Sequence, residues 1–364
     1  MKSFLISHNA GTMLPHQNNY NQGLQSLKGI AALTVFFSHS LHQFPSEFVN
    51  TLNGSFAHLF FDGQISVVIF MALSGFFYWK DESFSLRTYF FGVAKKAKKI
   101  YVPFILVMIV GWCLCNEFPT INPERYTEWS RAFWQNKVSF TELIRQCTIL
   151  FASNYDLINP PVWYLKYEVE MFIIMPLVVA LFRKYKWWIM IVVFPFCLFK
   201  LQFMAIYVMG MLAHCFVNDM KYREKLEHVV VRNHFIIFIL ILSLVLLNVF
   251  NELPISHFGL KLSLRFVFEE LVQGLGAVSL ICIIFLHSFR CLSNQVLVFF
   301  GNISYEFYLV HFLVILMIRR LFLNPIAFVV VAFSISVIIA YILNRLCTAI
   351  ISNKYLKMNN RNNV

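Results

Sequence analysis

A lysine and a histidine lie eleven residues apart in the first long apolar stretch of the chain, at Lys28 and His39. In an α-helix this spacing amounts to about three turns and a rise of about 16 Å, so both side chains share one face at different depths. Ionisable side chains are costly in hydrocarbon and usually line a cavity, a proton relay or a catalytic site there. A cation and an imidazole on one stripe indicate a site that handles a proton and an anion.

A second group of polar residues opens the apolar segment that we expect at 162–182. Glu168 follows Trp163 by five residues, which places its carboxylate about 7–8 Å below an interfacial aromatic anchor. If this helix enters from outside, Glu168 reaches the depth of His39, where a carboxylate can orient an imidazole and stabilise its protonated form. Two alternatives stay open: His39 as a structural hydrogen-bonding group, and Glu168 paired with Lys166 at the membrane rim.

Two more motifs carry polar side chains in or beside apolar segments. Ser304, Tyr308 and His311 recur at spacings of four and three and so share a helix face. Such a stripe either lines a cavity or joins neighbouring helices. Lys96 and Lys99 belong to a basic run, which either marks the cytoplasmic side or binds the phosphates of a nucleotide co-substrate.

The composition predicts an integral membrane protein of the all-α class. The chain is 59% hydrophobic and 13% charged, with 41 Phe among 364 residues, which is far from the balance of soluble domains. Apolar runs of near-spanning length recur along it and predict a bundle of about ten transmembrane helices. We expect these helices at 24–42, 57–79, 100–117, 162–182, 187–199, 201–217, 233–250, 266–288, 296–318 and 326–349.

The charge pattern predicts that both termini are cytoplasmic. Most of the 30 Lys and Arg residues fall in segments that lie inside under this topology, as the positive-inside rule requires. Arg319 and Arg320 run against the rule and have no explanation in the sequence. The expected division is a cytoplasmic tail at 1–23, a transmembrane domain at 24–349 with an extracytoplasmic loop at about 118–160, and a cytoplasmic tail at 350–364.

Several function classes find no support in the sequence. No Gly-rich phosphate loop is present, which argues against an ATP-driven machine. The eight cysteines lack metal or redox spacing, so we expect no metal site. No internal repeat is visible, which disfavours the inverted-repeat architecture of many transporters.

Taken together, the motifs resemble the acyltransferase-3 family of bacterial polytopic membrane proteins. The resemblance covers most of the chain and rests on five elements in the family order. They are Lys28 followed by His39; Leu73-Ser74-Gly75-Phe76; Lys96 and Lys99 ahead of Pro103; Trp163-Tyr-Leu-Lys-Tyr-Glu168 with Pro176; and Ser304-Tyr305 with Tyr308-Leu-Val-His311. Lysines stand here where the family has arginines, so the charge is kept but the bidentate guanidinium is not.

The resemblance implies a membrane-embedded O-acyltransferase of the stand-alone type. The donor would be cytoplasmic acyl-CoA, usually acetyl-CoA, as a co-substrate, with no permanently bound cofactor. The acceptor would be a hydroxyl of a cell-surface glycan such as O-antigen, capsule or exopolysaccharide, on a lipid carrier or a growing polymer. The location would be the bacterial inner membrane, and nucleic acid would not be a partner.

The same resemblance implies roles for individual residues. His39 would act as general base or as a transient acyl carrier, and Glu168 would orient or charge-balance it. The donor phosphates would meet Lys28, Lys96 and Lys99. Residues expected to line the cavity or to contact the glycan are Trp163, Ser304, Tyr305, Tyr308 and His311.

Two other functions remain open at this point. A proton-coupled transporter or flippase of lipid-linked glycan would use His39 and Glu168 as a proton relay. A glycan polymerase would use the long loop at 118–160, although this loop is not strongly basic. Neither class accounts for the joint pattern of the motifs.

Overall fold

The computed structural model describes most of the chain and shows a bundle of helices. The described residues are 15–53, 60–78, 85–120, 126–152, 154–200, 203–219, 223–225, 228, 262–286, 289–321 and 324–361. Within these ranges all regular elements are helical. Residues 233–250, where we expect one transmembrane helix, lie outside the described residues.

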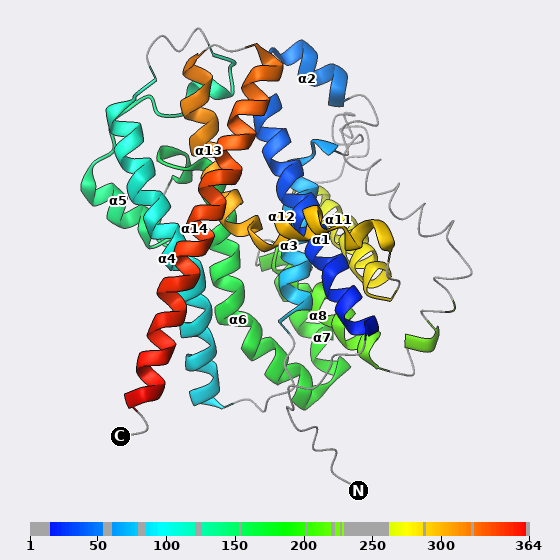
Figure 1. The fold of residues 1–364 in the computed structure, drawn as a ribbon. Coiled ribbons are helices and arrows are strands. Elements are labelled where there is room, and N and C mark those ends of the chain that lie inside the picture. Colours follow the sequence, from blue (N-terminus) through cyan, green and yellow to red (C-terminus); the bar gives the residue numbers. More distant parts are fainter. Residues whose placement is uncertain are drawn as a thin grey trace, which may run out of the picture.

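Figure 1 shows the helices of eight residues or more, and all but those at 46–53 and 140–147 follow the apolar segments of the sequence. They are α1 (Pro15–Leu41), α2 (Ser46–Asn53), α3 (Gly63–Phe76), α4 (Leu86–Glu117), α5 (Phe140–Cys147), α6 (Trp163–Tyr185), α7 (Trp187–Lys200), α8 (Met204–Asn218), α11 (Leu262–Leu286), α12 (Gln295–Asn302), α13 (Ser304–Ile318) and α14 (Pro325–Arg361). Helix α1 packs against α3, α12 and α13, and α3 packs against α8. The start of α1 and the end of α14 lie at the same end of the bundle, at the bottom of Figure 1.

The apolar helices agree with a membrane protein. Among the described residues, α4 and the first 27 residues of α14 are long and apolar enough to cross a membrane, and α12 with α13 adds a bent pair. Shorter apolar helices are α3, α8 and parts of α7 and α11. The number of spans and the side on which the termini lie stay predictions.

One predicted helix is wrong as a continuous element. The segment expected as one helix at 296–318 is broken at Ile303, and its two halves are bent by 76°. Gly301 and Asn302 are residues that favour the end of a helix, and Ser304 Oγ donates a hydrogen bond to the Gly301 carbonyl at 2.9 Å. That bond satisfies a carbonyl left open where α12 ends. The break leaves Ser304, Tyr308 and His311 on one helix, α13.

Small residues allow the helices around the site to approach closely. A Cβ added at Gly75 would overlap the carbonyl of Tyr207, and one added at Gly210 would overlap the carbonyl of Ala72. The α3–α8 contact is therefore a backbone-to-backbone contact on both sides. The small Ser74-Gly75 pair of the sequence permits this close approach, although Ser74 also makes a contact described below.

The Gly210→Ala variant is expected to lose about 1–3 kcal/mol of stability, because the added methyl forces α3 and α8 apart. The matched control is Gly92→Ala in α4, where an added Cβ meets nothing within 4 Å. The measurement is thermal unfolding of the detergent-solubilised protein. An equal melting temperature for the two variants would contradict the close α3–α8 contact.

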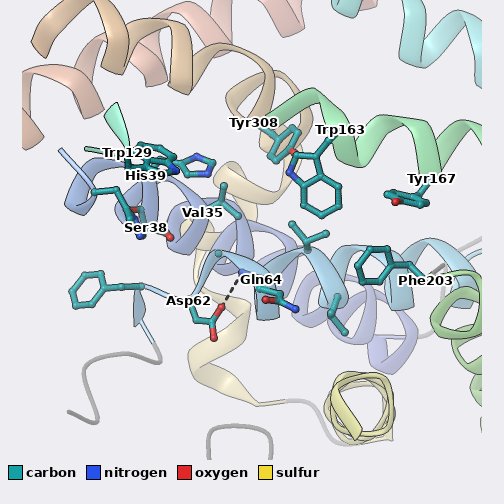
Figure 2. A pocket seen from close by; sticks show the side chains of 15 residues that line it. Val35, Ser38, His39, Asp62, Gln64, Trp129, Trp163, Tyr167, Phe203 and Tyr308 are labelled. Atoms are coloured by element: carbon teal, nitrogen blue, oxygen red, sulfur yellow. Dashed lines mark hydrogen bonds between the residues drawn. The ribbon is translucent and has the colours of Figure 1, made fainter. Parts of the chain in front are cut away.

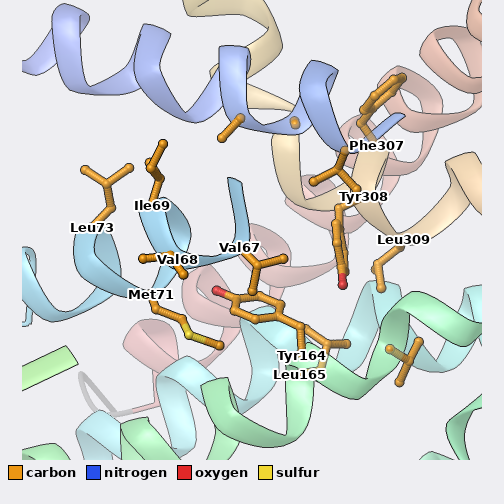
Figure 3. Close-up of a cluster of buried hydrophobic side chains, with 14 of the residues drawn as sticks. Val67, Val68, Ile69, Met71, Leu73, Tyr164, Leu165, Phe307, Tyr308 and Leu309 are labelled. Atoms are coloured by element: carbon orange, nitrogen blue, oxygen red, sulfur yellow. The ribbon is translucent and has the colours of Figure 1, made fainter. Parts of the chain in front are cut away.

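A buried apolar cluster joins the helices that carry the candidate site (Figure 3). Val68 and Met71 of α3, Leu165 of α6, and Leu309 of α13 are all nearly inaccessible to solvent. The rings of Tyr164 and Tyr308 lie within the same cluster in Figure 3. Two of the tyrosines near the candidate site are thus fixed by apolar packing.

Candidate active site

A hydrogen-bonded pair of histidines lies where α1 meets α13. His39 Nδ1 is 2.8 Å from His311 Nε2, and the two ring planes differ by only 2°. His311 Nδ1 lies 2.8 Å from the carbonyl of Tyr308. A carbonyl oxygen only accepts hydrogen bonds, so His311 Nδ1 carries a proton.

This arrangement assigns the protons of the pair. A neutral His311 with its proton on Nδ1 presents Nε2 as an acceptor, so His39 Nδ1 must be the donor. Nε2 of a neutral His39 is then left as a base. In the described part of the chain no hydrogen bond occupies that nitrogen. The geometry is that of an imidazole general base held in one tautomer by a second group.

The base faces a large cavity, called here the histidine cavity (Figure 2). Its volume is 570 Å³, within the range of about 300–1,000 Å³ typical of ligand sites. Aromatic and polar side chains line it together. They include Ser38, His39, His42, Asp62, Gln64, Trp129, Trp163, Tyr167, Phe203 and Tyr308.

A second cavity, called here the lysine cavity, contains the expected anion-binding residues. It has a volume of 300 Å³ and brings together Lys28 from α1 with Lys96 and Lys99 from α4. Lys28 Nζ lies 4.8 Å from the centre of the Phe77 ring. Lys96 Nζ lies 3.7 Å from the centre of the Tyr78 ring, close enough for a cation–π contact. The three cations from two helices could meet one polyanion.

Glu168 lies in the lysine cavity as well, in a network of hydroxyl groups. Oε1 accepts a hydrogen bond from Ser74 Oγ at 3.0 Å. Oε2 accepts from Tyr164 Oη at 2.9 Å and from Tyr207 Oη at 3.3 Å. The network joins α3, α6 and α8 around one carboxylate.

The expected contact between Glu168 and His39 is wrong. The partner of His39 is His311, and the carboxylate is occupied by three hydroxyls. The reason is geometric, because His39 and Glu168 line different cavities. The proposed pairing of Glu168 with Lys166 is likewise absent among the hydrogen bonds and ion pairs of the described residues.

Tyr308 lies at the junction of the two cavities, since it lines both. Its hydroxyl donates to the carbonyl of Pro161, and its ring centre is 5.7 Å from that of Tyr164. Tyr305 Oη donates to the Ile100 carbonyl at 2.8 Å, which ties α13 to α4. The hydroxyls of both α13 tyrosines thus hold backbone carbonyls of neighbouring segments.

The structure brings all the candidate residues to this one region. His39, Trp163 and Tyr308 line the histidine cavity, and His311 is hydrogen-bonded to His39. The residues that line the lysine cavity are Lys28, Lys96, Lys99, Glu168, Ser304, Tyr305 and Tyr308. Lys28 and His39 lie on one continuous helix, α1, but line different cavities.

The sequence did not reveal several residues of the site. Tyr164, Tyr207 and Ser74 have no sequence pattern that marks them as partners of Glu168. Trp129 lies in a long polar loop and still lines the histidine cavity. Within the described ranges, no group of three or more His, Cys, Asp or Glu residues is placed to hold a metal ion.

Comparison with known proteins identifies the family of the chain. No curated protein and no solved structure matches the chain. The model of the Acyltransferase domain family, acyltransferase-3, matches residues 21–345. This match spans both cavities and all ten candidate residues. The chain therefore belongs to the acyltransferase-3 family and is a membrane acyltransferase.

Proposed function

We propose that the protein moves an acyl group, most simply acetyl, from acyl-CoA to a hydroxyl of a cell-surface glycan. The observation that carries the proposal is the meeting of two unlike cavities at Tyr308. One holds three lysines suited to a polyanionic donor, and the other holds a histidine base beside aromatic side chains suited to a sugar. The donor would enter from the cytoplasm, and the bacterial inner membrane is the proposed location.

The donor is assigned to the lysine cavity on charge. Coenzyme A carries several phosphate charges, and lysine ammonium groups bind phosphate as point charges. Lys28, Lys96 and Lys99 converge there from two helices. The acyl end of the donor, bound by these groups, would extend toward Tyr308 and the histidine cavity.

The acceptor is assigned to the histidine cavity on the position of the base. His39 Nε2 takes the proton of the attacking hydroxyl, and the hydroxyl oxygen forms a bond to the thioester carbonyl carbon. The carbon–sulfur bond then breaks, and the CoA thiolate leaves and regains a proton from the imidazolium. His311 accepts a hydrogen bond from His39 Nδ1 throughout and so steadies the charged ring. A route through acyl-His39 uses the same groups and remains an alternative.

The direct test uses the full-length protein in lipid vesicles with radiolabelled acetyl-CoA. The acceptor is the surface glycan of the host, freed of its O-acyl esters by mild alkali. Label is expected to appear on the glycan as an alkali-labile ester. No labelled ester at any donor concentration would contradict the proposal, and movement of lipid-linked glycan across the vesicle membrane would support the transporter alternative.

Replacing both Lys96 and Lys99 by alanine is expected to raise KM for acetyl-CoA about tenfold, because phosphate loses charged partners. The matched control is the Lys95→Ala, Lys98→Ala pair in the same basic run, since both side chains are exposed and neither lines the cavity. Arginine at positions 96 and 99 should keep or improve donor affinity. If the two alanine pairs have the same KM for acetyl-CoA, the basic run acts only as a topology signal.

A further inference from the structure

Arg319 is a buried cation whose partners are all neutral. It lies in a single 3₁₀ turn, Arg319–Leu321, directly after α13 and is only 5% exposed. Nη1 donates to the Ser130 carbonyl and, at 2.6 Å, to Ser130 Oγ. Nη2 donates to Thr120 Oγ1 at 2.8 Å and to the Phe133 carbonyl at 3.4 Å. In the part of the chain that the structure describes, no carboxylate contacts this guanidinium.

Burial of a guanidinium without a counter-charge is expensive. Arg319 offsets this cost with four hydrogen bonds, three of which go to residues 126–134, called here the Trp129 segment. The ring of Tyr126, also in the segment, lies 4.4 Å from the guanidinium carbon. Arg319 therefore anchors this segment to the turn that follows α13.

The Trp129 segment is also tied to the end of α1 that carries the base. Ser130 Oγ lies 2.5 Å from Gln43 Oε1, and Gln43 Nε2 donates to the His39 carbonyl at 3.2 Å. Thr127 Oγ1 donates to the His42 carbonyl at 2.8 Å. A continuous set of hydrogen bonds thus connects Arg319 with the backbone of His39.

The segment places the indole of Trp129 beside the base. Its ring centre is 5.9 Å from that of His39, with the planes 20° apart, and 5.1 Å from that of His42. The rings of Phe312 and Phe133 contact the indole with their planes nearly perpendicular to it. In Figure 2, Trp129 lies next to His39 at one end of the histidine cavity.

We propose that Arg319 is a positioning residue that holds Trp129 as the aromatic surface on which the acceptor's sugar ring stacks beside His39. The inference rests on the proposed function and adds a specific acceptor contact to it. A sugar ring has an apolar face of C–H groups, which an indole matches, and hydroxyls at its edge, which the base can reach. Lysine at position 319 would keep the charge but lose the planar fork that holds two oxygens of the segment at once.

The experiment measures KM for the de-O-acylated host glycan and for acetyl-CoA with the full-length protein in vesicles. The variants Trp129→Ala and Arg319→Lys are expected to raise the glycan KM about tenfold while the acetyl-CoA KM changes less than twofold. Trp129→Phe should retain part of the acceptor affinity because it keeps an aromatic face. The combined Trp129→Ala, Arg319→Lys variant should be no worse than Trp129→Ala alone, since both act on one contact.

The matched control is Arg320→Lys, because among the described residues Arg320 donates to the carbonyls of Phe118 and Pro119 and not to the Trp129 segment. It should keep both KM values. Unchanged glycan KM in Trp129→Ala would overturn the inference, and so would an equal rise of both KM values in Arg319→Lys. A wild-type protein that transfers no label would instead overturn the proposed function, and this inference with it.

Discussion

Replacement of His39 by alanine is expected to lower the rate of acyl transfer about 10²–10⁴-fold, the contribution typical of a positioned general base. The protein should remain in the membrane at normal abundance, because His39 is partly exposed to the histidine cavity. The measurement is initial rate at saturating acetyl-CoA, together with the amount of protein. His228→Ala, at an exposed histidine outside both cavities, is the control.

The partner of His39 makes the prediction sharper. His311→Ala removes the acceptor that fixes the His39 tautomer and should lower the rate in its own right. His311→Gln should retain more activity, because its side-chain oxygen can still accept from His39 Nδ1. The double variant His39→Ala, His311→Ala should be no slower than His39→Ala alone, since residues that act as a unit are not additive.

Three outcomes would contradict this assignment. Appreciable activity in His39→Ala would exclude His39 as the base. Losses in the two single variants that multiply in the double variant would show that His311 acts independently of His39. A parallel loss of protein and activity would support a structural role for the pair.

Helical periodicity predicted which site residues lie together on one helix, because it relates residues that are close together in the sequence. The eleven-residue spacing predicts that Lys28 and His39 lie on one helix, and α1 runs without a break from one to the other, although the two residues line different cavities. The spacing also placed Ser304, Tyr308 and His311 on one helix, although α12 and α13 are separate helices. The expected helix at 296–318 does not include the break at Ile303, because it was drawn from hydropathy and the apolar character continues through this position. Gly301 and Asn302, which favour the end of a helix, were the signal in the sequence for the break.

The partners of the polar groups could not be predicted from spacing. His39 and His311 are 272 residues apart, and only the packing of α1 on α13 brings them together. Glu168 was assigned to His39 on depth alone, but depth does not fix the direction in which a side chain points. Arg319 was anomalous by the positive-inside rule, and its hydrogen bonds to the Trp129 segment now account for it.

Glu168→Gln is expected to lower kcat about 10–100-fold without raising KM for acetyl-CoA. The carboxylate accepts hydrogen bonds from Ser74, Tyr164 and Tyr207, and bonds to a charged acceptor are worth about 1.5–3 kcal/mol each. Glutamine keeps the shape but offers one acceptor oxygen and an NH₂ group, so the three hydroxyls must rearrange. Tyr164 packs against Tyr308, where the two cavities meet, and the rearrangement therefore acts where the acyl group must pass.

In Glu168→Gln the affinity for acetyl-CoA is expected to stay the same or rise, whereas in the lysine variants it is expected to fall. Removing a negative charge from the lysine cavity leaves its three cations less compensated, which favours the phosphates of the donor. A lower kcat with an equal or lower donor KM would separate Glu168 from Lys96 and Lys99. The control is Glu170→Gln on the same helix, since Glu170 lines neither cavity and should behave as wild type. A wild-type kcat in Glu168→Gln would mean that the three hydroxyls need only an acceptor of the right shape, because the charge of the carboxylate would then contribute nothing to the chemical step.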